Sequence, residues 1–239
     1  MIKTATKKFI RSIGYDIHRF SPHSSADAQL LAAMGHAEID LIFDIGANTG
    51  QFASGIRTAG FMGHIVSFEP LSSARTELTE HAKRDRNWIV HDQCAIGAHD
   101  GEIEINIAGN SVSSSVLPML EKHSSASVGS AYVGSERVPI MRLDSIADKY
   151  LDANSQLFLK IDTQGYEWQV LDGAIETLKR AKGVLCEVSL VPLYEGQKVW
   201  LDVIGRLESE GFLLWALQKG FVDHRTGQSL QMDAIFLRR

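Results

Sequence analysis

Four acidic residues end or interrupt short apolar segments of the sequence, and their spacing is the first indication of chemistry. Asp44 lies in LIFDIGANTG, Glu69 ends HIVSFE, Asp162 ends LFLKID and Glu187 lies in VLCEVS. Each segment is short and nearly continuously apolar, which predicts a buried strand. The carboxyl ends of parallel strands meet at one edge of a sheet, where open α/β sheets bind ligands. We therefore expect these acids to face one crevice.

The turn after the first of these strands reads G-x-x-x-G, not the G-x-G-x-x-G of a dinucleotide-binding turn. Gly46 and Gly50 bracket it, with Ala47 and Asn48 inside, and glycines let the backbone approach a ligand closely. Asp44, two residues before the first glycine, would repel pyrophosphate. It would suit a cationic ligand such as the ammonium end of S-adenosylmethionine (SAM). A plain tight connection between strand and helix is the alternative for this stretch alone.

The next two strand ends extend the same nucleoside site. Glu69 follows Asp44 by 25 residues and ends the second strand, where an acid accepts hydrogen bonds from ribose hydroxyls. At the third strand end, Asp92 or the backbone near Cys94 and Ala95 would lie beside the adenine. An ordinary strand-terminating turn explains Asp92 equally well.

Asp162 and Glu187 are the candidates for catalysis. A reaction that removes a proton from its substrate needs aligned reactants and a group that takes that proton. Asp162 is the first candidate for that base, and capping of the following helix is its alternative. Glu187 would bind acceptor hydroxyls or a divalent ion, but two acids do not make a metal site, and no histidine spacing indicates zinc. No metal is predicted.

Strand-like and helix-like segments alternate along the chain, which is typical of a parallel sheet covered on both faces. No helix separates the last two strands, so a terminal hairpin is expected to add one antiparallel strand. The fold class is therefore α/β, with a Rossmann-like, doubly wound, mostly parallel seven-stranded sheet. The expected strands are 41–45, 63–69, 87–92, 157–162, 183–189, 212–217 and 233–238, and the expected helices are Gln51–Ala59, Ser72–Arg84, Glu167–Ala181 and Val199–Glu210.

Two segments depart from this alternation. Residues 93–143 contain the alternating strand-like stretches EIEINIA and RVPIMRL, joined by a Ser-rich segment from Ser111 to Ser135 that is expected to be a long loop. We expect this insertion to cover the carboxyl edge of the sheet, with Ser114 near the ligand. Residues 1–38 are expected to form an N-terminal helical cap, and residues 39–239 the ligand-binding domain.

The N-terminal segment is basic and amphipathic. Ile2, Phe9, Ile13 and Ile17 fall near one helical face, with lysine and arginine elsewhere. Packing of this thin apolar face on the domain is favoured. A weak contact with a membrane surface is the alternative.

Composition excludes several classes of protein. The 239 residues carry a formal net charge of −5, which gives no global attraction to nucleic acid. No apolar run approaches the roughly 18 residues that span a bilayer. The only two cysteines lie in or beside apolar segments, as buried thiols do in a reducing compartment. A cytoplasmic location is therefore expected.

The segments FDIGANTGQFA, SFEP, RLDSI, LKIDTQGYEWQVLDGA and DAIFLR together resemble the FkbM family of SAM-dependent methyltransferases, from about residue 40 to the end. The most specific block is Leu159–Ala174, where Gln164 stands in place of a glutamate found in many members. The resemblance implies a class I methyltransferase fold, SAM as the methyl donor, and a hydroxyl oxygen as the usual acceptor, commonly on a sugar or a natural product. Gln164 and Tyr194 are the further candidates for contact with the acceptor.

The residues and the resemblance together favour a SAM-dependent O-methyltransferase that acts on a sugar or a related small molecule. Two alternatives stay open at this point: a non-catalytic subunit with a SAM-binding fold, and an NAD-dependent oxidoreductase or epimerase. The turn after the first strand does not have the glycine pattern that an NAD-dependent enzyme would need.

Overall fold

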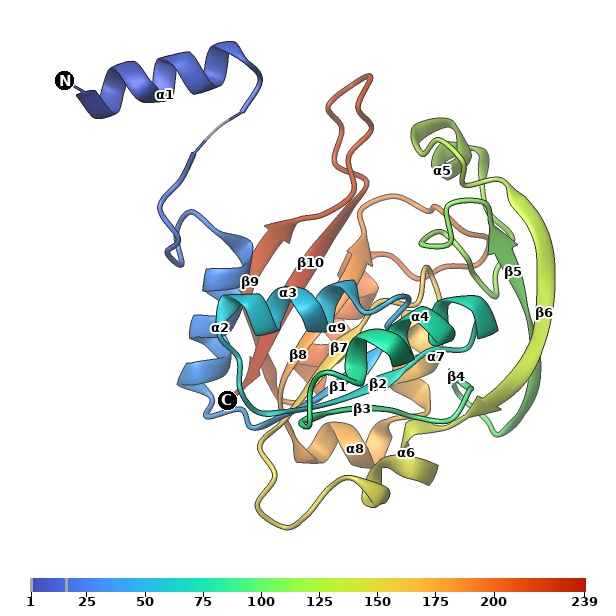
Figure 1. Ribbon diagram of the computed structural model, residues 1–239. Coiled ribbons are helices and arrows are strands. Elements are labelled where there is room, and N and C mark those ends of the chain that lie inside the picture. The colour runs from blue at the N-terminus through green and yellow to red at the C-terminus, as the bar shows by residue number, and fades with distance from the viewer. Residues whose placement is uncertain (1, 16) are drawn as a thin grey trace.

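The computed structural model describes residues 2–15 and 17–239 of the chain, and it confirms the predicted sheet (Figure 1). Seven strands follow the order β3-β2-β1-β7-β8-β10-β9. β10 is antiparallel to both of its neighbours, whereas the other pairings are parallel. The strands are β1 (Leu41–Ile45), β2 (His64–Phe68), β3 (Trp88–Val90), β7 (Leu157–Ile161), β8 (Ala181–Ser189), β9 (Phe212–Lys219) and β10 (Gln231–Arg238).

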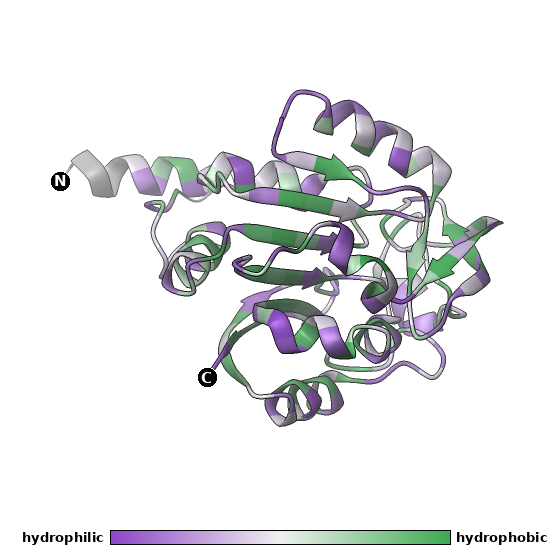
Figure 2. Cartoon of the chain, turned by 90° about the horizontal axis from the view of Figure 1, so that it is seen from below, coloured by the Kyte–Doolittle hydropathy of each residue, from purple (hydrophilic) through white to green (hydrophobic). Residues whose placement is uncertain are grey.

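Helices cover both faces of the sheet, which explains the nearly continuous apolar strands. β1 and β7 are buried at every position. One apolar cluster lies between the sheet and α2 (Ala26–His36), α3 (Gln51–Ala59) and α4 (Ser72–Ala82). Another lies between the opposite face and α6 (Leu143–Ile146), α7 (Glu167–Asp172), α8 (Ile175–Arg180) and α9 (Trp200–Ser209). Figure 2 shows the apolar strands between helices whose outer sides are hydrophilic.

The single helix predicted over 167–181 is two helices, α7 and α8, and β8 already begins at Ala181. The break follows from close packing at Gly173, where an added Cβ would lie 1.9 Å from the carbonyl oxygen of Gly97. Asp144 supplies the N-terminal cap of α8 from outside, because its carboxylate accepts hydrogen bonds from the backbone N–H groups of Glu176 and Thr177 (3.0 and 2.8 Å).

The insertion forms a second, three-stranded sheet in the order β4-β6-β5. Its strands are β4 (Ala95–Ile96), β5 (Gly101–Ala108) and β6 (Tyr132–Met141). The Ser-rich segment is shorter as a loop than expected, because it contains helix α5 (Glu121–Ala126) and the first residues of β6. A 3-10 turn, η1 (Ala147–Lys149), leads from α6 back toward the main sheet.

The N-terminal segment divides into two parts. α2 packs on the domain with Leu30, Ala33 and Met34 buried. α1 (Ile2–Ser12) instead stands apart from the sheet (Figure 1). Its Phe9 side chain is 67% exposed, and Ile13, in the turn after the helix, is 57% exposed. The expected packing of Phe9, Ile13 and Ile17 on the domain is therefore wrong, because all three side chains are exposed. Among the described residues, no helix is long and apolar enough to cross a membrane.

Candidate functional site

A cavity of about 550 Å³ opens at the carboxyl edge of the sheet. Its walls come from the turns after β1, β2 and β7, from residues 94–96 and 111–116, and from α2, α3 and the β9–β10 hairpin. Its volume lies within the roughly 300–1,000 Å³ typical of ligand pockets. The segments that the sequence predicted at one edge therefore surround a space of ligand size.

The glycine turn after β1 brings two loops into contact. Gly46 has a φ of +75°, and a Cβ at this position would lie 1.9 Å from the carbonyl oxygen of Asp162. The N–H groups of Gly46 and Ala47 both donate to the carbonyl oxygen of Phe68 (3.1 Å). Only glycine fits where the β1 and β7 turns meet so closely. Gly46, Ala47 and Asn48 line the cavity. Gly50 does not line the cavity and is instead the N-cap residue of α3.

Glu69 is buried in the cavity wall and held by two backbone N–H groups. Asn48 donates to its Oε2 atom at 2.7 Å, and Leu71 donates to its Oε1 atom at 2.9 Å. Burial raises the pKa of Glu69 to about 7 even though these two hydrogen bonds oppose the shift. Both oxygens keep lone pairs free for further donors such as ribose hydroxyls.

Asp44 does not line the cavity, which corrects the expectation that it contacts a ligand cation. It is fully buried, accepts a hydrogen bond from the Ser67 hydroxyl (3.1 Å), and pairs with the ammonium of Lys160, which lies 3.2 Å away. Lys160 also donates to the carbonyl oxygen of Gly46 (2.9 Å) and lies 3.7 Å from Asp162. Burial opposes the charge on Lys160, but the Asp44 and Asp162 carboxylates outweigh it and hold its pKa above the ordinary value. The protein itself supplies the cation for Asp44.

For the end of the third strand, the sequence offered Asp92 or the backbone near Cys94 and Ala95 as the neighbour of the adenine, and the structure places Asp92 away from the cavity. Asp92 is fully exposed, 4.0 Å from Arg75, and it does not line the cavity. The strand ends two residues earlier, at Val90, so the chain has already turned away from the edge. Cys94 and Ala95 do line the cavity. Burial raises the pKa of the Cys94 thiol to about 12, so the thiol is neutral.

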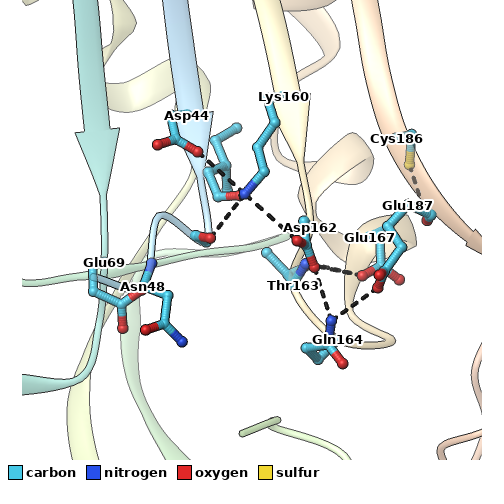
Figure 3. Close-up of polar contacts among 12 residues, drawn as sticks. Asp44, Asn48, Glu69, Lys160, Asp162, Thr163, Gln164, Glu167, Cys186 and Glu187 are labelled. Atoms are coloured by element: carbon cyan, nitrogen blue, oxygen red, sulfur yellow. Dashed lines mark hydrogen bonds and ion pairs between the residues drawn. The ribbon is translucent and has the colours of Figure 1, made fainter. Parts of the chain in front are cut away.

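Asp162, Gln164 and Glu187 converge at the other end of the cavity (Figure 3). The Gln164 side-chain N–H₂ group donates to Asp162 Oδ1 and to Glu187 Oε2, each at 2.9 Å. Gln231, at the start of β10, donates to the same Glu187 oxygen at 2.6 Å. Burial and the nearby Asp162 carboxylate raise the pKa of Glu187 well above its usual range. Glu187 therefore gives up its proton less readily than an exposed glutamate does. The Asp162 side chain is 34% exposed and faces the open cavity.

Glu167 is a support for the β7 turn and does not line the cavity. Its Oε1 atom accepts hydrogen bonds from the backbone N–H groups of Thr163 and Gly165, both at 3.0 Å. Burial raises its pKa to about 7. The turn that carries Asp162 is thus fixed from behind by a buried carboxyl group.

Of the two remaining candidates, Ser114 lines the cavity and Tyr194 does not. Tyr194 is fully buried, and its hydroxyl donates to Gln164 Oε1 at 2.9 Å. It therefore orients Gln164 instead of contacting an acceptor. Ser115 adds a second link, since its hydroxyl donates to the Gln164 carbonyl oxygen at 2.6 Å.

Several cavity residues were missed by the sequence reasoning: Lys160, Gln218, Gln231 and Asp233 on strands, and Asp27 and Leu30 on α2. The strand residues left a signal, because each is a polar side chain inside or at the end of an otherwise apolar strand. No group of three or more metal-ligating side chains occurs within the described part of the chain.

Comparisons with known proteins give one family match. A model described as the methyltransferase FkbM domain matches residues 44–214. No curated protein matches the chain.

Solved structures with similar folds include two methyltransferases and a fibrillarin. A TehB-like SAM-dependent methyltransferase from Corynebacterium glutamicum is 13% identical, with 100% of this chain and 97% of that chain covered and a TM-score of 0.42. A putative RNA methyltransferase from Pyrococcus horikoshii is 13% identical, with 89% and 83% covered and a TM-score of 0.47. Fibrillarin from Aeropyrum pernix, solved with natively bound SAM, is 11% identical, with 87% and 74% covered and a TM-score of 0.47.

Proposed function

The chain belongs to the FkbM methyltransferase family, and we propose that it transfers a methyl group from SAM to a hydroxyl oxygen of a sugar or a related polyol. The sequence alternatives of an NAD-dependent enzyme and a non-catalytic subunit lose their support with this membership. The observation that carries the proposal is the cavity itself, which has a buried carboxyl group, Glu69, at one end and a cluster of carboxyl and amide groups at the other.

The residues at the first end fit SAM. Glu69 presents two carboxyl oxygens at the cavity wall, the Gly46 turn leaves no room for a Cβ, and Cys94 and Ala95 offer a small, neutral surface for an adenine ring. Glu69 would accept from the ribose hydroxyls, and the turn from Gly46 to Asn48 would contact the methionine part. When bound, SAM supplies an electrophilic methyl group.

Asp162 is the proposed base. Its carboxylate faces the cavity beside Lys160 and Gln164, so it is oriented by one ion pair and one hydrogen bond before an acceptor arrives. There it would accept the proton that the acceptor hydroxyl loses as the new C–O bond forms. Glu187 would hold a second hydroxyl of the acceptor, which sets the angle of approach.

We expect Asp162→Asn to lower kcat at least about 100-fold, because general bases contribute about 10²–10⁴ in rate and the amide cannot take the proton. The measurement is formation of S-adenosylhomocysteine (SAH) with a panel of glycosides, with SAH affinity measured in parallel. Asp148→Asn, at an exposed surface acid 2.8 Å from Arg180, is the matched control and should change neither value. An Asp162→Asn enzyme with kcat within threefold of the parent would remove Asp162 from the mechanism.

A weak membrane-surface contact through α1 is also proposed. Phe9 on this helix and Ile13 directly after it are exposed, and Lys7 and Lys8 give the helix positive charge. We expect the full chain to sediment severalfold more with vesicles that contain 30% phosphatidylglycerol than with phosphatidylcholine alone, and Lys7→Glu with Lys8→Glu to abolish the difference. Equal sedimentation with both kinds of vesicle would contradict this contact. A cytoplasmic location stays a prediction from the sequence.

A further inference from the structure

The backbone of Gln164 holds a conformation that side chains rarely adopt. Its φ is +53°, in the left-handed region, and non-glycine residues there cluster at functional sites, where the surrounding structure compensates for the strain. The Ser115 hydroxyl donates to the Gln164 carbonyl oxygen at 2.6 Å. An added Cβ on the next residue, Gly165, would lie 2.8 Å from the Tyr194 ring. The strained turn therefore points to a function for the Gln164 side chain.

The Gln164 amide lies between two carboxyl groups (Figure 3). Its nitrogen donates to Asp162 Oδ1 and to Glu187 Oε2, each at 2.9 Å, so both of its hydrogens are used. We call Asp162 and Glu187 the carboxyl pair. Two neighbouring carboxyl groups repel each other when both are ionised, and such groups tend to share one proton. A nitrogen between them blocks a direct hydrogen bond from one to the other and lowers the repulsion without adding charge.

The Tyr194 hydroxyl sets the orientation of this amide. Turned by 180°, the amide would direct its oxygen at the carboxyl pair instead of its nitrogen. Tyr194 opposes that turn because it is fully buried and its hydroxyl donates to Gln164 Oε1 at 2.9 Å. The ring of Tyr194 is held in turn by His123, with ring centroids 5.1 Å apart. The hydrogen bonds therefore run in one direction, from the hydroxyl to the amide oxygen and from the amide nitrogen to the carboxyl pair.

The other charged groups around the carboxyl pair favour retention of a proton. Lys160 on β7 is the nearby cation, whereas Glu167 on α7 and Asp233 on β10 add negative charge. Burial raises the pKa of the Cys186 thiol and of the Tyr194 hydroxyl, so both of these groups are neutral. Negative groups thus outnumber the cation, and the uncharged amide is what holds the two carboxyl groups apart.

We propose that Gln164 is a positioning residue that bridges Asp162 and Glu187, so that Asp162 shares no proton with Glu187. Held in this way, Asp162 is free to accept the proton that an acceptor hydroxyl loses. Tyr194 acts one step further away, through the orientation of the amide. The inference rests on the proposed function, in which Asp162 is the base.

The test is a pH titration of the carboxyl pair, followed by ¹³C NMR on the full chain labelled at its aspartate and glutamate carboxyl carbons. Asp162→Asn and Glu187→Gln assign the signals. Gln164→Met removes the amide but keeps the length of the side chain. We expect it to move the upper titration step of the pair about one pH unit or more higher, because the ionised pair loses two hydrogen bonds and can share a proton. Tyr194→Phe, which keeps the ring, should move that step in the same direction by less.

The double variant Tyr194→Phe with Gln164→Met shows whether the hydroxyl acts through the amide. If it does, the double variant should titrate as Gln164→Met alone does. Tyr150→Phe is the matched control, because the Tyr150 hydroxyl lies 2.5 Å from His91 Nδ1, in another part of the fold. This control should leave the upper step unchanged. With any acceptor that the parent methylates, the acid limb of the kcat–pH profile should move as the titration step moves.

An upper step that moves by less than about 0.3 pH unit in Gln164→Met would overturn the proposed bridge. Shifts that simply add in the double variant would remove Tyr194 from it. SAH affinity, measured by calorimetry on each variant, separates this inference from the proposed function. We expect it to be unchanged, since no variant alters the nucleoside end of the cavity. Loss of SAH binding in the unaltered protein would remove the methyltransferase function and leave the titration result standing.

Discussion

Replacement of Glu69 by alanine is expected to raise the dissociation constant for SAH at least about 100-fold. The carboxylate is the group that would accept from the ribose hydroxyls, and hydrogen bonds to a charged group contribute about 1.5–3 kcal/mol each. The same change also leaves the Asn48 and Leu71 N–H groups without their acceptor, at 2.7 and 2.9 Å in the intact protein. The glycine turn then keeps its hydrogen bonds to the Phe68 carbonyl oxygen but loses the link from Asn48, so the ligand contact and part of the preorganisation are lost.

The measurement is isothermal titration with SAH, with NAD as a ligand that should not bind. Glu69→Gln separates the two effects, because its amide oxygen can still accept one hydrogen bond. We expect Glu69→Gln to raise the dissociation constant for SAH about tenfold, to a value between those of the parent and the alanine variant. Glu80→Ala is the control, since Glu80 is an exposed acid on the surface of α4 that pairs with Lys83. Affinity for SAH within threefold of the parent in a folded Glu69→Ala protein would contradict the assignment of the nucleoside end.

The sequence was sufficient for the sheet because burial on both faces leaves an unambiguous trace. β1 and β7 read as LIFDI and LFLKI, and a strand covered by helices on both sides needs such a run. The hairpin of β9 and β10 was predictable because no helical segment separates them. The break between α7 and α8 was not predictable, since it depends on the close approach of Gly173 to the backbone at Gly97. These two glycines are 76 residues apart in the sequence.

The sequence was sufficient to place residues at the cavity where the signal lies in one short segment. It was insufficient where the position of a side chain depends on how two strands lie side by side. The positions of Gly46 and Glu69 at the cavity follow from the glycine turn after β1 and from the acid that directly follows β2. The role of Asp44 could not be predicted in this way, because its partner is set by the register of β1 against β7, which places Asp44 opposite Lys160. Lysine inside the apolar run LFLKI was the available signal, since a buried lysine requires a buried acid. The expectation that Asp92 lies at the cavity was wrong because its strand already ends at Val90, two residues earlier.

Replacement of Lys160 by methionine is expected to cost about 3–5 kcal/mol in the free energy of unfolding, because it leaves the Asp44 carboxylate buried and unpaired. Asp44 is fully buried, and among the residues that the structure describes Ser67 is the one side-chain donor left to it once the ammonium at 3.2 Å is gone. Urea denaturation measures the change. The matched control is Lys83→Met, which removes a lysine from an exposed ion pair with Glu80 and should cost less than about 1 kcal/mol.

The double variant Asp44→Asn with Lys160→Met decides whether the loss comes from the pair or from the lysine stem. If an uncompensated charge is the cause, the double variant should recover much of the stability that Lys160→Met loses, since no charge is then buried alone. A double variant no more stable than Lys160→Met would place the cost in packing and in the lost hydrogen bond to the Gly46 carbonyl oxygen (2.9 Å). Because Lys160 touches both Asp44 and the turn that carries Asp162, recovery of stability without recovery of methyl transfer would show that one side chain serves the fold through Asp44 and the reaction through Asp162.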